Sequence, residues 1–147
     1  MAERTNCEKK IEHEKFNLKI GTTNRNNPLV VYIEGKTFIS PNVEKNSYNI
    51  DISNIKKSFN RHISNELKTS SLFESNHILD FQVAQSGINV NKKTFLNFQL
   101  LFKQKKDKIM KMKDIKEKST PFIYNILNML EDCIVDHEFS LFKIKKQ

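Results

Sequence analysis

The chain contains little glycine and little proline. Only 3 glycines and 3 prolines occur among its 147 residues. Both residue types interrupt regular elements, so their scarcity indicates that most of the chain lies in helices and strands. The scarcity of glycine also argues against the glycine-rich phosphate loops of nucleotide-binding proteins, whose motifs do not occur here. We therefore expect no cofactor.

Cysteines and long apolar runs are scarce as well. Cys7 and Cys133, the 2 cysteines, lie far apart and share no motif, as is typical of free thiols in a reducing compartment. No apolar run approaches the roughly 20 residues that a membrane span needs. Residues 1–15 contain no apolar secretion signal. We expect a protein that is not secreted and has no membrane partner, in a host or bacterial cytoplasm or in a particle assembled there.

Patterns for catalysis and metal binding are missing. None of the four histidines (His13, His62, His77 and His137) stands at metal-ligand spacing from a cysteine or another histidine. Cys133 and His137 are four residues apart on one helix face, but no third group is evident to orient the imidazole as a base. The sequence therefore predicts a non-enzymatic protein with no catalytic residue, no metal site and no small-molecule substrate.

Arginine is rare, although the chain is basic. The formal net charge is +8, and of 25 basic residues only three are arginine (Arg4, Arg25 and Arg61), which leaves 22 lysines. Arginine supplies the planar fork that reads guanine edges, so sequence-specific reading of DNA is disfavoured. Lysine, asparagine and isoleucine also have A/T-rich codons, so part of the charge reflects gene composition. The remaining charge suits nucleic acid, an acidic protein or an anionic membrane surface equally well.

The first third of the chain predicts strands. Apolar residues alternate with polar ones over residues 16–20, and residues 29–33 are rich in β-formers. Residues 34–36 (Glu-Gly-Lys) predict a tight turn into a second short strand over residues 37–40. Residues 1–14 are polar with mixed charge, which predicts an extended arm.

The remaining two thirds predict a helix, a hairpin, a second helix and a closing strand. Apolar residues at helical spacing favour a helix over residues 51–67. Alternation over residues 79–84 and 96–102 favours an antiparallel hairpin whose polar face is interrupted by Phe95 and Leu101. We expect the N-terminal strand or a partner to cover those two side chains. Ser119-Thr120-Pro121 predicts the start of the second helix, and residues 139–144 predict the last strand.

This order, β-α-β-β-α-β, predicts an α+β fold. We expect an antiparallel sheet of four to five strands with two helices packed on one face, plus the N-terminal arm. The predicted organisation is an arm at residues 1–14 and a single domain at 15–147 with a lysine-rich insertion at 103–118. The order is that of the RNA-recognition fold, but residues 96–104 lack its glycine and aromatic pattern.

The lysine-rich insertion is the one local feature that stands out. Residues 103–118 hold eight lysines against three acidic residues. Ile109, Met112 and Ile115 are three apart, which predicts a short amphipathic helix whose apolar edge docks on the chain's own core or on a neighbour. The lysines favour a solvated surface, an acidic protein partner or nucleic acid. The predicted contact residues are Lys105, Lys106, Lys108, Ile109, Lys111, Met112, Lys113 and Ile115.

In size, in its richness in Asn, Lys and Ile, and in α+β layout, the chain resembles neck, ring and tail-completion proteins of tailed bacteriophages. The resemblance covers the whole chain and rests on no single motif, so it carries over no residue. It implies a virion structural subunit that forms a homo-oligomeric ring between portal and tail. Other copies of the chain and neighbouring structural proteins would be its partners. The alternative is a non-specific nucleic-acid-binding module, including a ribosome-associated one, that uses the lysine-rich segment.

Overall fold

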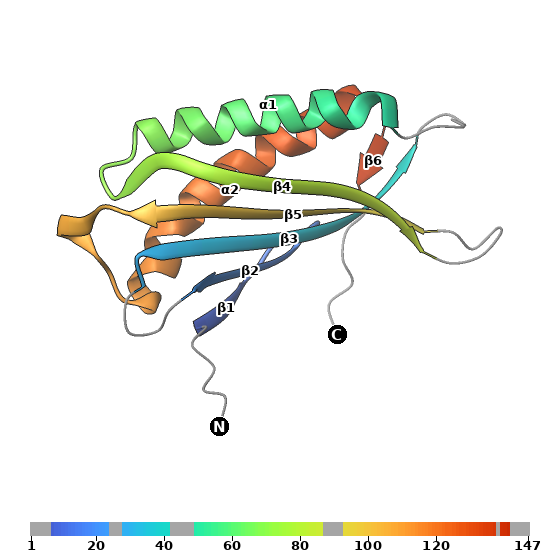
Figure 1. Cartoon of the computed structure of the whole chain (residues 1–147). Coiled ribbons are helices and arrows are strands. Elements are labelled where there is room, and N and C mark those ends of the chain that lie inside the picture. Colours follow the sequence, from blue (N-terminus) through green and yellow to red (C-terminus); the bar gives the residue numbers. More distant parts are fainter. Residues whose placement is uncertain (1–6, 24–27, 42–48, 87–92, 138, 142–147) are drawn as a thin grey trace.

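The computed structural model describes residues 7–23, 28–41, 49–86, 93–137 and 139–141 (Figure 1). The strands are β1 (Cys7–Ile11), β2 (Asn17–Thr22), β3 (Val30–Pro41), β4 (Phe73–Ser86), β5 (Lys93–Gln104) and β6 (Phe139–Leu141). The helices are α1 (Asn49–Lys68) and α2 (Met112–Asp136), with a 3-10 turn at Lys106–Lys108. This is the α+β class that the order of patterns predicted.

The six strands form one sheet in which all neighbours are antiparallel. The order is β1-β2-β3-β5-β4. Strand β2 pairs with β3 at residues 31–36, and β6 pairs with β3 further along, at residues 39–41. Strand β3 is therefore central, and the sheet has more strands than the four to five predicted.

Both helices cover one face of the sheet, as expected. Figure 1 shows α1 alongside β4 and α2 passing diagonally behind the strands. The alternation of side chains along the strands explains why one face is covered, because every second residue of β3 and β5 is buried against the helices. Residues that are at most 1% exposed supply its centre, and they include Ile33, Ile55, Phe59, Leu100, Ile123 and Leu130.

Helix α2 begins seven residues earlier than Ser119-Thr120-Pro121 predicted. Met112 and Ile115 are buried and extend the apolar stripe of the helix across Pro121, which lies inside it. The side chain of Ser119 is fully buried instead of capping the helix, and its hydroxyl finds no partner in the described part of the chain. Pro121 has no backbone N–H to donate to the carbonyl oxygen four residues earlier, and the packing of the added turns outweighs the loss of that hydrogen bond.

The turn predicted at residues 34–36 was also wrong, because β3 runs unbroken from Val30 to Pro41. Gly35 lies opposite Phe98 of β5, and the Phe98 ring occupies the space where a side chain at position 35 would lie. A Cβ atom at Gly35 would stand 2.3 Å from that ring. The glycine thus admits an aromatic ring against the backbone and does not mark a turn.

The predicted arm at residues 1–14 needs a similar correction from Cys7 onward. Residues 7–11 form β1, in which Ile11 pairs with Leu18 and is 5% exposed. Residues 12–16 connect β1 to β2, and Phe16 is 1% exposed. These apolar residues draw the segment into the sheet, while residues 1–6 lie outside the described part.

Replacing Gly35 with alanine should destabilise the fold, because the new methyl group meets the Phe98 ring. We expect a loss of about 1–3 kcal/mol in the free energy of unfolding, the usual cost of overpacking a core. Urea unfolding of Gly35→Ala, Phe98→Leu and the double variant checks this. The double variant should lose less than the sum of the single losses, and strict additivity would contradict the contact.

Candidate interaction surfaces

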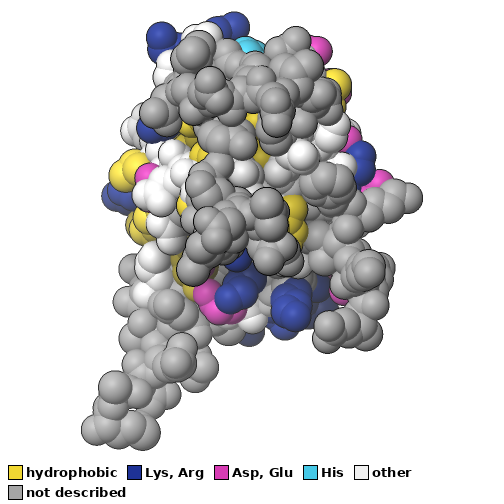
Figure 2. All heavy atoms as spheres, turned by 90° about the vertical axis from the view of Figure 1, so that its right-hand side faces the viewer, with side chains coloured by type: hydrophobic (Ala, Val, Ile, Leu, Met, Phe, Trp, Pro, Cys, Tyr) yellow, Lys and Arg dark blue, Asp and Glu magenta, His cyan; other side chains and the backbone are white. Residues whose placement is uncertain are grey.

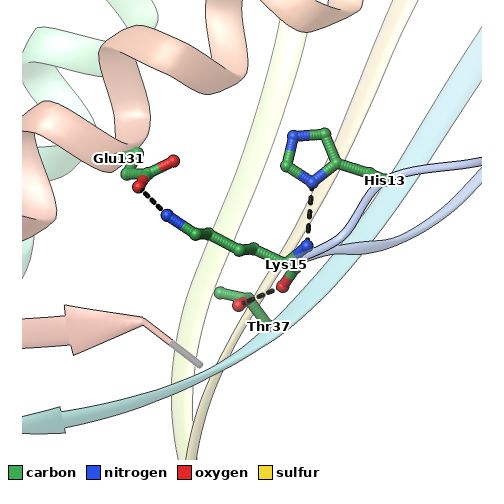
Figure 3. Close-up of polar contacts among 4 residues, drawn as sticks. All are labelled: His13, Lys15, Thr37 and Glu131. Carbon is green, nitrogen blue, oxygen red and sulfur yellow. Dashed lines mark hydrogen bonds and ion pairs between the residues drawn. The ribbon is translucent and has the colours of Figure 1, made fainter. Parts of the chain in front are cut away.

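The β1–β2 connection is fastened to helix α2. Lys15 forms an ion pair with Glu131 of α2, and its carbonyl oxygen accepts a 2.6 Å hydrogen bond from the Thr37 hydroxyl (Figure 3). The Tyr124 hydroxyl of α2 donates to the carbonyl oxygen of Glu12. These contacts join three elements that are distant in sequence, so they fix the position of β1 at one edge of the sheet.

His13 lies inside this connection. Its ring packs edge-on against the rings of Phe16 and Tyr124, with centroids 5.3 and 5.4 Å away. Its Nδ1 accepts a 3.0 Å hydrogen bond from the Lys15 backbone N–H. Burial is the main cause that lowers the pKa of His13, and the nearby Glu131 carboxylate opposes it. The neutral imidazole is therefore the form that fits this site.

The lysine-rich segment is held in place by a buried glutamine. Gln104 ends β5 and is 0% exposed. Its side-chain amide donates to the carbonyl oxygens of Pro28, at 2.6 Å, and Met110, at 3.3 Å, and its Oε1 accepts from the Met110 N–H at 2.8 Å. Sequence reasoning missed Gln104, since nothing in the local pattern distinguishes it from an exposed strand residue.

The structure separates the predicted contact residues into two groups. Met112 is 9% exposed and Ile115 is 0% exposed, so both serve the chain's own core and are not available to a partner. The apolar edge of the segment therefore docks on the chain's own core, which was one of the two alternatives. The prediction that Met112 and Ile115 contact a partner is corrected. Ile109 is 44% exposed. Lys106, Lys108, Lys111 and Lys113 are also exposed, and Lys105 is half-buried.

The sheet has two outer strands of different character. Strand β1 spans five residues and carries Lys9 and Lys10, both exposed. Strand β4 spans 14 residues and contains neither lysine, arginine nor proline, the residues that usually protect an edge. A register shift interrupts β4 between Phe73 and His77, and from His77 to Ser86 its pairing with β5 is regular. In the described part of the chain, each outer strand has one strand neighbour.

The face of the sheet that the helices leave uncovered is hollowed. A hollow of about 880 Å³ lies over the middle of β2, β3, β4 and β5. Two cross-strand rows of polar side chains form its floor: Lys10, Lys19, Glu34, Gln99 and Asp80 in one, and Asn17, Lys36, Asn97 and Gln82 in the other. The predicted N-terminal strand is β2, which lies within the sheet beside β3, so it does not cover Phe95 and Leu101 as one alternative predicted.

Basic side chains are unevenly distributed over one end of the molecule. Figure 2 views the molecule from the right-hand end of Figure 1. One group of basic side chains lies in the lower half of that view, at the height where β1 and β2 lie in Figure 1, and others lie near its upper edge and flanks. Among the described residues in this view, hydrophobic side chains appear in separate small areas.

The thiol and imidazole that share a face of α2 do not engage each other. Cys133 is buried, and burial raises the pKa of its thiol. His137 places Nδ1 2.8 Å from the carbonyl oxygen of Cys133. A thiol that stays protonated is a weak nucleophile, so this pair offers no activated sulfur. Among the described residues, no three His, Cys, Asp or Glu side chains gather as metal ligands.

Comparison with family models, with curated proteins and with solved structures found no match for this chain. Neither described helix combines the length and the apolar character that crossing a membrane requires.

The stability of the fold should fall in mild acid because of His13. Its pKa is lower in the folded chain, so the unfolded chain binds the proton more readily. The contribution of His13 to the free energy of unfolding should be complete above a pH of about 6.5. It should decrease as the pH falls toward the pKa that His13 has in the folded chain. Urea unfolding at pH 7.5 and 5.5 checks this. Between these two pH values, the His13→Gln variant should lose less stability than the native chain.

His62→Gln is the matched control. His62 lies on α1, outside the β1–β2 connection that holds His13, and its Nε2 is 3.7 Å from Glu66 Oε1. This variant should keep the acid loss of the native chain. An unchanged acid loss in His13→Gln would contradict the assignment.

Proposed function

We propose that the protein is a non-enzymatic assembly subunit whose copies join edge to edge into a ring, as in the neck or tail connector of a tailed bacteriophage. The observation that carries this proposal is the outer edge of β4, which pairs regularly over the ten residues from His77 to Ser86 and contains no lysine or proline. Such an edge offers unpaired backbone donors and acceptors to another strand. The setting in a virion rests on the resemblance in size, composition and layout.

Charge supports pairing of β4 with β1 of the next copy. The first polar row of the uncovered face begins at Lys10 on β1 and ends at Asp80 on β4. Both side chains are exposed, and within the described ranges neither forms an ion pair. When β4 of one copy lies beside β1 of the next in this register, Lys10 and Asp80 become neighbours of opposite charge.

The number of strands supports a ring over a two-fold dimer. Five successive antiparallel strands leave β1 and β4 running in the same direction. Copies related by rotation about an axis along the strands therefore meet in a parallel junction, and each copy uses two different edges. Head-to-tail contacts of this kind form a ring when the rotation between copies closes, and an open filament when it does not. A two-fold β4–β4 contact would leave Lys10 without a partner.

Reversing one charge at the junction should disrupt assembly. Asp80→Lys places two lysines together, and Lys10→Glu places two acids together, so each variant should associate about tenfold more weakly. The double variant Lys10→Glu/Asp80→Lys restores opposite charges and should recover the native mass. Native mass spectrometry and sedimentation velocity measure the species, with circular dichroism to establish folding.

Asp132→Lys is the matched control, because Asp132 is exposed and lies on α2, not on either outer strand. It should assemble like the native chain. A native chain that stays monomeric at high concentration would exclude assembly through its own copies. A species no larger than a dimer would exclude the ring, and a double variant that stays dissociated would exclude the β1–β4 junction.

Non-specific nucleic-acid binding is a second candidate function, supported by the lysines of the 103–118 segment. Lys106, Lys108, Lys111 and Lys113 are exposed around the start of α2, and none forms an ion pair in the described part of the chain. Unneutralised lysines close together attract phosphates without reading sequence.

Salt dependence tests this second function. Binding of labelled single-stranded DNA should weaken steeply as the salt concentration rises. The slope of log K against log salt concentration should be about −0.7 for each phosphate neutralised. Replacing Lys106, Lys108, Lys111 and Lys113 with glutamine should flatten that slope. Replacing Lys56, Lys57 and Lys68 of α1 with glutamine is the control and should change it less. Absence of any binding at low salt would dismiss this function.

A further inference from the structure

The central floor of the hollow on the uncovered face has features of a binding site, and edge pairing does not use this floor. Its floor consists of central strands, in which Glu34 and Lys36 of β3 lie opposite Gln99 and Asn97 of β5. These strands are paired on both sides along this stretch. The floor is therefore rigid, and a ligand lying on it would leave the sheet edges free.

The charge of the hollow fits a neutral occupant. Three lysines (Lys10, Lys19 and Lys36) are matched by three carboxylates (Glu12, Glu34 and Asp80) around it. A polyanion such as nucleic acid would meet all three carboxylates, at a cost that a neutral ligand avoids. The hollow thus differs from the 103–118 segment, where lysines outnumber acids.

Carboxamides dominate the remaining polar floor. Asn17, Gln82, Asn97 and Gln99 line the hollow, and their side chains form no hydrogen bond with another described residue. Each carboxamide offers both donors and an acceptor. This is the complement of a peptide backbone, which presents N–H and C=O groups in alternation.

Apolar side chains flank the hollow at both ends of the strands. Phe38 and Phe95 pack edge-on at one end, 6.3 Å apart, with Lys36 Nζ 4.3 Å from the centre of the Phe95 ring. Ile78, which is 67% exposed, lies opposite Leu101 at the other end. Along β3 the two ends are separated by the six residue-to-residue steps from Tyr32 to Phe38, or about 20 Å.

We propose that this face binds an extended, uncharged peptide segment of a partner protein. The segment lies along the strands and places one apolar side chain at each end of the hollow. A span of about 20 Å corresponds to roughly seven residues of extended chain, in which the first and seventh side chains point to the same side. Its backbone groups between these anchors bond to the carboxamides.

Selection from a displayed library of seven-residue peptides, with the whole chain immobilised, tests the proposal. Enriched peptides should carry apolar residues at the first and seventh positions and uncharged residues between them. Binding of a synthetic enriched peptide, followed by fluorescence anisotropy, should change little with salt. The double variant Asn97→Ala/Gln99→Ala should weaken binding about tenfold, through loss of two carboxamides.

Asn125→Ala/Asn128→Ala is the control, since both carboxamides are exposed on α2 and away from the hollow. It should bind the peptide as the native chain does. Failure to enrich any peptide, enrichment of acidic peptides with salt-sensitive binding, or equal loss in the two double variants would each overturn the proposal. Neither Asn97 nor Gln99 lies on an outer strand, so this result is independent of the ring.

Discussion

The uncovered face of the sheet depends on the contact between Gly35 and Phe98. That contact lets β3 continue where a Glu-Gly-Lys sequence would otherwise favour a turn. Because β3 is continuous, it pairs with β2 and β6 on one side and with β5 on the other. Both polar rows cross β3 next to Gly35, at Glu34 and Lys36. A turn at this point would have divided the sheet and left no continuous floor.

The sequence predicted best where burial on one face controls the pattern. Alternation along β4 and β5 and the apolar stripe of α1 were confirmed, since one side of each element meets the core. Local signals failed where packing outweighed them. Ser119-Thr120-Pro121 has the composition of a helix start, but Met112 and Ile115 bury enough apolar surface to add turns before it. Residues 7–14 were assigned to an arm because Ile11 alone gave too weak a strand pattern.

Contacts between distant segments lay beyond sequence reasoning. Lys15 and Glu131 are 116 residues apart, and Gln104 joins loops from two parts of the chain. A lysine, a glutamate and a glutamine are ordinary surface residues by composition, and only the fold brings their partners to them. The edges and the hollow were missed for the same reason, because both arise from the order of strands and not from any single segment.

Charge at the C-terminus of α2 opposes the helix dipole, which favours bases there. Asp132 and Asp136 lie in or near the last turn, which holds no basic residue. At the start of the helix, Asp114 in the first turn suits the dipole, but three lysines surround it and Glu117. Core packing on both sides of Pro121 compensates for the unfavourable part of this arrangement. Lys113 and Lys118 are exposed, which supports a surface role for them.

The two surfaces proposed on the sheet are compatible with each other. Pairing of β4 with a neighbouring β1 uses backbone groups in the plane of the sheet, whereas a peptide on the hollow uses side chains that stand above that plane. The junction would also prolong the first polar row, since Lys10 of the next copy would follow Asp80. Neighbouring hollows in a ring would then lie side by side on one continuous sheet, with the helices on its other face. An assembly of this kind would present repeated peptide-binding sites at a fixed spacing, which favours a partner that is itself repeated.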